Sequence, residues 1–155
     1  MKLMTLIFLM SNNQVLLAQK KRGFGVGKWN GVGGKVEENE TTEQALIRET
    51  QEEIDVTPTE FEKVANLTFD ELHEGERKLM HVNVYTCTKW SGEPKESEEM
   101  NPAWFDLTKI PYDQMWSDDP YWLPKVLAGK KITADFKLNN KNEVTSHEVK
   151  EVEGL

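Results

Sequence analysis

Three glutamates in one short stretch have the spacing of a metal-binding group. On an α-helix, residues three and four apart lie on the same face, so Glu49, Glu52 and Glu53 would project together. Carboxylates packed this closely repel one another, and a hard divalent cation such as Mg²⁺ relieves that repulsion by binding their oxygens. The spacing predicts a cation-binding helix face. Arg48, four residues before Glu52, is placed to hold part of that face in position.

The helix that must carry these glutamates is predicted over residues 41–54, which contain no glycine or proline. Thr41 is followed three residues later by Gln44, which is the pattern of a capping box at a helix start. The positions that would fasten the helix to a sheet recur every four residues: Leu46, Thr50 and Ile54.

A solvated acidic face is the usual alternative for a helix with the pattern E-x-x-E-E. That alternative must also explain why a glycine-rich segment, residues 20–34, precedes the helix, and why an arginine stands directly before the first glutamate. The combination favours a chemical role for the glutamates.

The rest of the chain predicts an α/β fold. A second helix is expected from Asp118, Asp119 and Pro120 to Gly129, because proline suits the first turn of a helix and glycine suits its end. Apolar and alternating stretches predict strands at residues 3–10, 14–19, 61–72, 78–90, 103–107, 132–138 and 144–152. Strands mixed with two helices, without a repeat or a linker, predict one domain over residues 1–155.

The charge balance argues against nucleic acids and membranes as partners. The chain has 19 Lys and Arg against 27 Asp and Glu, a net charge of −8, whereas phosphate backbones and anionic lipids attract basic patches. Cys87 is the only cysteine, so no intramolecular disulfide can form, which fits a reducing cytoplasm. The apolar run at residues 3–10 lacks a following cleavage site, so we expect a strand there and not a signal peptide. We expect a cytoplasmic monomer that acts on a small molecule.

Residues 34–56 resemble the Nudix box, G-x5-E-x7-R-E-U-x-E-E-x-G-U, in which U is a bulky aliphatic residue. Thr50 departs from it where an aliphatic residue is usual. Asp55 replaces a glycine at the helix end, where we expect a left-handed conformation that Asp tolerates better than most residues. Neither departure removes a carboxylate of the box. Seven positions match at every spacing: Gly34, Glu40, Arg48, Glu49, Glu52, Glu53 and Val56.

The resemblance covers nearly the whole chain and is weakest at residues 57–80. KKRGFGVGKWNGVGGKV (20–36) and ESEEMNPAWFDLTKIPYDQMWSDDPYWLPKVL (96–127) are similar to the MutT-type oxidised purine nucleoside triphosphatases of this family, as is the segment from residue 130. The resemblance implies a Nudix fold, an α/β/α sandwich around a mixed β-sheet. It also implies hydrolysis of oxidised purine nucleoside triphosphates, such as 8-oxo-dGTP and 2-hydroxy-dATP, to a monophosphate and pyrophosphate.

The resemblance further implies a phosphate site that uses Mg²⁺, or Mn²⁺ in its place, to neutralise charge in the transition state. Arg48 would orient the glutamates, Glu40 would support them, and Lys20 would meet phosphate. Glu99 is left open as a metal ligand or as the general base. The expected metal ligands are the carbonyl of Gly33 and the side chains of Glu49, Glu52, Glu53 and Glu99. The catalytic candidates are Arg48, Glu52, Glu53 and Glu99.

A pocket for an altered purine needs a stacking wall and hydrogen-bonding groups for the edge of the base. The resemblance implies that Trp116 stacks on the base and that Asn30, Asp118 and Asp119 bind its edge. The remaining lining and floor are expected from Phe24, Phe69, Met80, Trp122 and Thr5. Two adjacent carboxyl groups in a partly dry pocket should not both ionise, so the pKa of one aspartate should rise.

Each of these residues also has an ordinary structural explanation. An aspartate at a helix start is commonly an N-cap, a tryptophan commonly belongs to a core, and an asparagine among glycines commonly forms a turn. Their joint occurrence with the Nudix box is what favours a base pocket.

The box by itself predicts the phosphate chemistry and leaves the rest of the substrate open. One alternative is a Nudix hydrolase of undamaged nucleotides, ADP-ribose, dinucleoside polyphosphates or capped RNA. Another is a non-catalytic nucleotide-binding or protein-interaction module on the same fold. The W-x-D-D segment at residues 116–119 argues against the first alternative, and the retained glutamates argue against the second.

Overall fold

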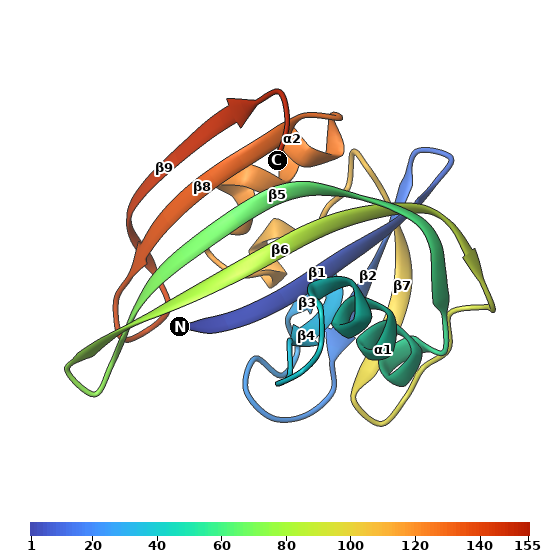
Figure 1. Ribbon diagram of the computed structural model, residues 1–155, viewed down its shortest axis with the longest axis horizontal. Coiled ribbons are helices and arrows are strands. Elements are labelled where there is room, and N and C mark those ends of the chain that lie inside the picture. Colours follow the sequence, from blue (N-terminus) through green and yellow to red (C-terminus); the bar gives the residue numbers. More distant parts are fainter.

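The computed structural model describes residues 1–155 as a twisted sheet with two α-helices (Figure 1). Helix α1 spans Thr42–Ile54 and helix α2 spans Asp119–Leu127, with a short 3₁₀ helix at Tyr112–Gln114. Neither helix combines the length and apolar character needed to span a bilayer. The strands are β1 (Lys2–Ser11), β2 (Gln14–Lys20), β3 (Trp29–Asn30), β4 (Val32–Lys35), β5 (Thr57–His73), β6 (Glu76–Ser91), β7 (Met100–Asp106), β8 (Lys131–Leu138) and β9 (Val144–Val152).

The sheet is mixed, with the strand order β3-β2-β1-β6-β5-β8-β9. The pairs β1–β6 and β5–β8 are parallel, and the other pairs are antiparallel. Strand β4 pairs with β1, and β7 pairs with β2. The predicted Nudix fold, with helices on a mixed sheet, is confirmed.

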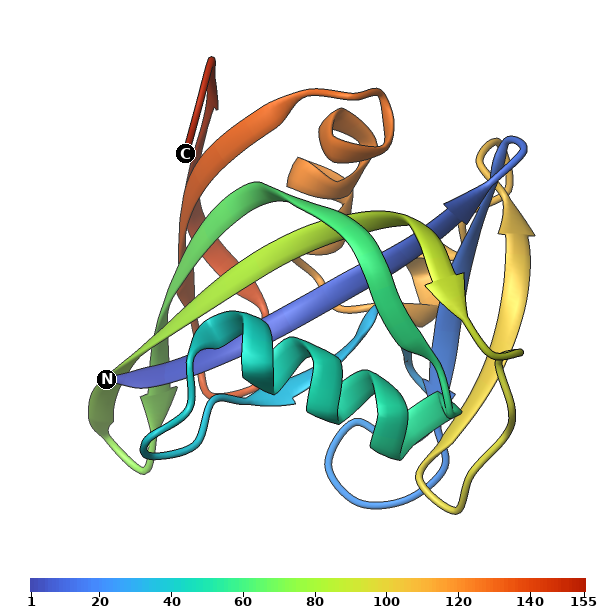
Figure 2. The ribbon, with the colours of Figure 1, turned by 45° about the vertical axis from the view of Figure 1, so that its right-hand side comes forward.

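Strands β1 and β2 stay together only at their shared turn, where Met10 faces Val15 and Ser11 faces Gln14. Beyond that turn, β1 pairs with β4 and β6, whereas β2 pairs with β3 and β7. The sheet therefore divides into two parts that diverge from one hairpin, and Figure 2 shows these parts separating away from the turn. The divergence leaves room for a cavity between them.

The alternation of side chains along β1 divides the apolar residues between two cores. Ile7 and Leu9 pack in one cluster with Leu46 of α1, whereas Phe8 packs in the other with Trp122 of α2. Successive side chains of a strand point to opposite faces of the sheet, so the two helices must cover opposite faces. Figures 1 and 2 show α1 and α2 on opposite sides of the sheet.

The two ends of α1 follow the predicted local chemistry. The Thr41 hydroxyl accepts a hydrogen bond from the backbone of Gln44 at 3.1 Å, and the Gln44 side chain accepts one from the backbone of Thr41 at 2.8 Å. At the other end, Asp55 has φ 60° and ψ 38°, the left-handed conformation expected where the box usually has glycine. The departure at Thr50 leaves no polar group unsatisfied, because its buried hydroxyl donates to the carbonyl of Leu46 at 2.7 Å.

The glycine-rich segment is more regular than a loop, because it contains β3 and β4. Glycine permits this pairing at Gly33, where a Cβ atom would overlap the carbonyl oxygen of Thr5. Strand β5 also begins earlier than predicted, at Thr57, so helix α1 passes into a strand after a two-residue connection.

The capping box at α1 yields a testable prediction. Thr41→Ala removes one of the two reciprocal hydrogen bonds and should lower the free energy of unfolding by about 1 kcal/mol. Thr42→Ala is the matched control, since the Thr42 side chain makes no hydrogen bond in the structure. Urea denaturation of both variants measures the difference, and equal stabilities would show that the box contributes nothing.

Candidate functional site

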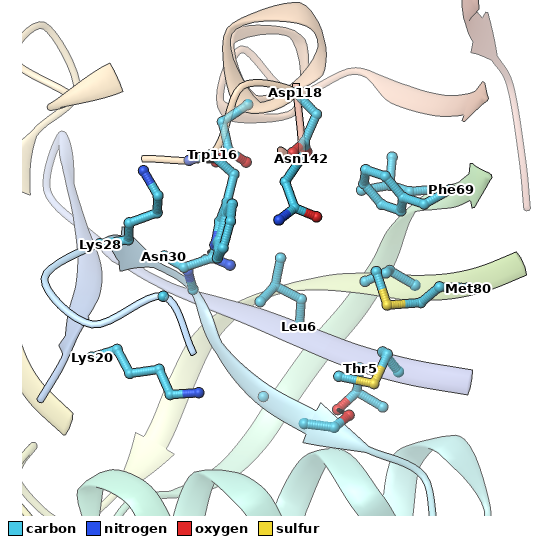
Figure 3. A pocket seen from close by; sticks show the side chains of 18 of the residues that line it. Thr5, Leu6, Lys20, Lys28, Asn30, Phe69, Met80, Trp116, Asp118 and Asn142 are labelled. Atoms are coloured by element: carbon cyan, nitrogen blue, oxygen red, sulfur yellow. Dashed lines mark hydrogen bonds between the residues drawn. The ribbon is translucent and has the colours of Figure 1, made fainter. Parts of the chain in front are cut away.

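A cavity of about 460 Å³ lies between the two parts of the sheet. Its walls come from β1, the segment leading to β3 and β4, the β5–β6 hairpin, the start of α2 and the C-terminal hairpin. Figure 3 shows Lys20 and Thr5 near α1 and Trp116 and Asp118 at the other end. All ten residues predicted to bind substrate line the cavity: Thr5, Lys20, Phe24, Asn30, Phe69, Met80, Trp116, Asp118, Asp119 and Trp122.

Arg48 organises the acidic face of α1. Its guanidinium binds both carboxylate oxygens of Glu40, at 2.7 and 2.9 Å, and one oxygen of Glu49, at 2.8 Å. It also donates to the carbonyl of Lys35 at 3.1 Å and to Glu52 at 3.4 Å. The hydrogen bond from Arg48 lowers the pKa of Glu40 to about 2, so Glu40 stays ionised and holds the arginine in place.

Glu49 reaches the cavity wall because Gly34 has no side chain. A Cβ atom at Gly34 would lie 2.5 Å from the carboxyl carbon of Glu49. Glu53 lies next to Glu49 with its Oε2 atom buried and without a hydrogen-bond partner. Burial, reinforced by the charge of Glu49, raises the pKa of Glu53 to about 8. An orphaned carboxylate oxygen beside a second carboxylate suits a hard divalent cation, whose charge would offset that burial.

The other two acidic candidates point elsewhere in the structure. The Glu52 side chain is 60% exposed and reaches only toward Arg48. Glu99, in the segment before β7, accepts from the guanidinium of Arg22 at 2.8 and 2.5 Å. No three acidic, histidine or cysteine side chains are grouped closely enough to bind an ion as they stand. Glu49 and Glu53 are therefore the preformed pair, and Glu52 and Glu99 would have to turn toward them.

Lys20 connects the acidic helix with the cavity. Its charge opposes the rise that burial causes in the pKa of Glu53. At Glu99, whose pKa is lowered mainly by the hydrogen bond from Arg22, the charge of Lys20 acts in the same direction as Arg22. Figure 3 shows the ammonium group directed from the glycine-rich segment toward α1. A cation in this position can contact an anionic group that enters the cavity from the side of α1. Gly33 lines the cavity at the same end, as the neighbour of Gly34 in β4.

At the opposite end, Trp116 forms a wall that the glycine-rich segment supports. Phe24 stacks on the indole with ring centroids 5.2 Å apart. A Cβ atom at Gly25 would lie 2.7 Å from the indole, so the backbone passes directly against the ring. The Lys28 ammonium lies 5.2 Å from the ring centroid and donates to the carbonyl of Met115 at 3.4 Å. These contacts hold the ring as a flat apolar surface.

Asp118 and Asp119 present two nearly buried carboxyl groups to the cavity, with exposed fractions of 8% and 2%. One oxygen of Asp118 accepts from the indole N–H of Trp122 at 2.8 Å, and one oxygen of Asp119 accepts from the backbone N–H of Trp116 at 2.9 Å. Each carboxyl group keeps a second oxygen without a partner in the protein. Burial raises the pKa of Asp118 to about 6, and burial together with the charge of Asp118 holds the pKa of Asp119 well above its ordinary value.

The ordinary explanation for this pair, an N-cap, does not hold. Asp118 occupies the N-cap position of α2 but makes no side-chain capping bond. Trp122, predicted as apolar lining, is completely buried and makes a polar contact with Asp118. A tryptophan four residues after an aspartate on a helix can reach back to it, so the contact between Asp118 and Trp122 could have been predicted from their spacing.

The remaining candidates line the cavity between these two ends. Asn30, in β3, accepts a hydrogen bond from the backbone of Gly31 at 2.8 Å through its side-chain oxygen, which leaves its NH₂ group free. Thr5 lies on β1 opposite Gly34. Phe69 and Met80 face each other across β5 and β6 and form part of the apolar wall.

Several lining residues were not predicted, including Leu6, Lys28, Leu138 and Asn142. Lys28 is close in sequence to predicted residues and could have been inferred from them, whereas Leu6 follows Thr5 on β1, where alternation alone directs the two side chains to opposite faces. Leu138 and Asn142 belong to the C-terminal hairpin, and their presence depends on the parallel pairing of β8 with β5. No local pattern in the sequence indicates that pairing.

The raised pKa of Asp118 predicts a pH dependence of stability. Between the ordinary value of 3.8 and about 6, the folded protein binds more protons than the unfolded chain, so its free energy of unfolding falls as pH rises. Asp118→Asn has no carboxyl group to lose a proton, so it should not show this fall. The difference in free energy of unfolding between Asp118→Asn and wild type should therefore grow in favour of the variant by on the order of 2 kcal/mol from pH 4 to pH 7.

Denaturant titrations across that pH range measure the effect. Asp113→Asn, at an exposed aspartate just before α2, is the matched control and should follow the wild-type profile. Parallel profiles for Asp118→Asn and wild type would contradict the prediction.

Comparison with known proteins relates this geometry to a family. The NUDIX domain model matches residues 2–126. The "Oxidized purine nucleoside triphosphate hydrolase" of Danio rerio is 46% identical over 154 residues, covering 99% of this chain and 97% of that protein, and the Mus musculus protein of the same name is 41% identical with the same coverage. A solved structure of a MutT protein from Bacillus halodurans superposes with a TM-score of 0.83 over 96% of this chain and 97% of its own; at 24% identity, it supports the fold alone.

Proposed function

The chain belongs to the Nudix family of hydrolases, and we propose that it hydrolyses oxidised purine nucleoside triphosphates to a monophosphate and pyrophosphate. One observation carries the proposal. A single cavity is lined at one end by a buried carboxyl pair for a base, and its other end is lined by Gly34, against which the Glu49 carboxylate of α1 lies. The names of the two full-length relatives support the same substrate class. We place the reaction in the cytoplasm, because a single buried cysteine suits a reducing compartment.

At the phosphate end, we propose that Glu49, Glu53 and the carbonyl of Gly33 bind Mg²⁺, with Glu52 and Glu99 completing the site. Mn²⁺ would serve in its place, since it accepts the same oxygen ligands. An ion held by these residues would offset the charge of the triphosphate and would lower the pKa of the attacking water. The orphaned oxygen of Glu53 supports this assignment, because it is a buried carboxylate oxygen that the protein itself does not satisfy.

The surrounding residues position these groups. Arg48 fixes Glu40 through two hydrogen bonds and Glu49 through one, and its positive charge offsets the repulsion among the carboxylates of the acidic face. Lys20 contacts the phosphate chain and holds it against α1. Glu99 gains freedom to approach the site when it leaves Arg22, and it serves as a metal ligand or as the general base for the attacking water.

At the base end, Trp116 stacks on the purine while Asn30, Asp118 and Asp119 bind its edge. A carboxyl group with a raised pKa can donate a hydrogen bond when it is protonated and accept one when it is ionised. The free oxygens of the pair therefore offer both a donor and an acceptor near neutral pH. Such a pair suits 8-oxoguanine and 2-hydroxyadenine, whose edges present different donors and acceptors.

The substrate class is tested by measuring pyrophosphate release with Mg²⁺ from 8-oxo-dGTP, 2-hydroxy-dATP, dGTP, dATP and ADP-ribose. The oxidised purines should have the highest kcat/KM. Glu53→Gln should lower kcat/KM by at least about 100-fold, because it removes a charged oxygen from the proposed metal site. A preference for ADP-ribose or for undamaged nucleotides would leave the family assignment intact and refute the assignment of the base pocket.

The aspartate pair is tested by Asp118→Asn and Asp119→Asn on the same panel. An amide keeps the shape of the carboxyl group but can no longer exchange a proton, so each variant should favour the base that matches its fixed donor and acceptor. We expect each variant to change the ratio of kcat/KM for 8-oxo-dGTP over 2-hydroxy-dATP by about tenfold. Equal losses on both substrates would mean that the pair does not select the base.

A further inference from the structure

The cavity has a wall that lies outside the matched Nudix domain. The family match ends at residue 126, within α2. Strand β8 follows, pairs in parallel with β5, and continues through a tight turn into β9. Two residues of this C-terminal hairpin, Leu138 and Asn142, line the cavity, and Figure 3 shows Asn142 at the end that holds Trp116 and Asp118.

Asn142 is the one residue among residues 140–143 of the turn that is partly shielded from solvent. Asn140, Lys141 and Glu143 are exposed, whereas Asn142 is half-buried. Its amide makes no hydrogen bond within the protein, although its backbone N–H donates to the carbonyl of Asn139 at 3.1 Å. Figure 3 shows the side chain reaching into the cavity beside Trp116 and Asp118, with both atoms of the amide directed into open space. An amide group in this position has one acceptor and two donors available for a ligand.

The turn around Asn142 is held firmly. The side-chain oxygen of Asn139 accepts from the backbone of Lys141 at 2.9 Å and from that of Glu143 at 3.0 Å. The hydroxyl of Ser117 donates to the carbonyl of Asn142 at 2.8 Å. The turn is thus tied to the W-S-D-D segment itself, so Asn142 keeps its place relative to Trp116 and Asp118.

We propose that the side-chain amide of Asn142 hydrogen-bonds the edge of the purine and, together with Asp118 and Asp119, selects among purine bases. This proposal rests on the proposed function. Its physical basis is that a site offering directional polar groups to one base leaves those groups unsatisfied with another, and so discriminates more strongly than an apolar wall. The selecting residue comes from the C-terminal hairpin, so base selection depends on a part of the chain beyond the matched domain.

The backbone conformation of Asn142 permits a clean deletion of its side chain. Its φ of 60° is a left-handed value, which glycine adopts without strain. Asn142→Gly therefore removes the amide and preserves the turn. Asn140→Gly makes the same change two residues earlier, at an exposed position outside the cavity, and controls for any loosening of the turn.

The first experiment measures kcat/KM for 8-oxo-dGTP and 2-hydroxy-dATP with wild type and both variants. Asn142→Gly should change the ratio of the two values by about fivefold or more, because the two bases present different edges to the lost amide. Asn140→Gly should leave the ratio within about twofold of wild type. A ratio that stays within twofold for Asn142→Gly, or a loss shared equally by both substrates, overturns the proposal.

A second experiment separates this proposal from the proposed function. Calorimetry without metal measures the binding of 8-oxo-dGMP, dGMP and dAMP to wild type and Asn142→Gly, and so needs no turnover. Failure of the proposed function would appear as a wild-type preference for unoxidised nucleotides. Failure of the Asn142 proposal would appear as equal ratios of Kd among the three nucleotides in wild type and in Asn142→Gly, whichever base wild type prefers.

Discussion

Two adjacent glycines in β4 decide where the carboxylate helix lies relative to the rest of the molecule. Gly33 lets the strand approach β1 so closely that a Cβ atom would overlap the carbonyl of Thr5. Gly34 lets the carboxylate of Glu49 rest against the backbone of the same strand. Together they bring α1, β4 and β1 within contact at one end of the cavity. Any larger side chain would push the helix and its glutamates away from the cavity.

Charge burial is the common feature of the two ends of the cavity. Glu49 and Glu53 at one end, and Asp118 and Asp119 at the other, are adjacent carboxyl groups removed from water, and burial raises the pKa of each of the four. Burying such groups costs stability unless a partner compensates. Functional sites are where proteins tolerate that cost, because a ligand supplies the missing partner. A cation suits the first pair, and the polar edge of a base suits the second.

The supporting contacts at the two ends differ in kind. Arg48 and its carboxylate partners form a charged network on one helix and the segment just before it, with hydrogen bonds of 2.7–2.9 Å to Glu40 and Glu49. The base end is assembled from separate elements: the glycine-rich segment supports Trp116, α2 supports Asp118 through Trp122, and the C-terminal hairpin adds Asn142. The proposed phosphate end therefore depends on contacts local to α1, whereas the proposed base end depends on how separate segments of the chain pack together.

The sequence by itself determined what depends on neighbours along the chain. The capping box at Thr41, the left-handed residue at Asp55 and the shared face of the glutamates follow from helix geometry, which acts over three or four residues. The predicted cavity residues came from the resemblance of the sequence to a family and not from helix geometry. Only the tertiary structure decided the pairing of β4 with β1, the capture of Glu99 by Arg22 across 77 positions, and the entry of Asn142 into the cavity. These contacts depend on strand register and on how distant segments pack, and no local periodicity encodes either of them.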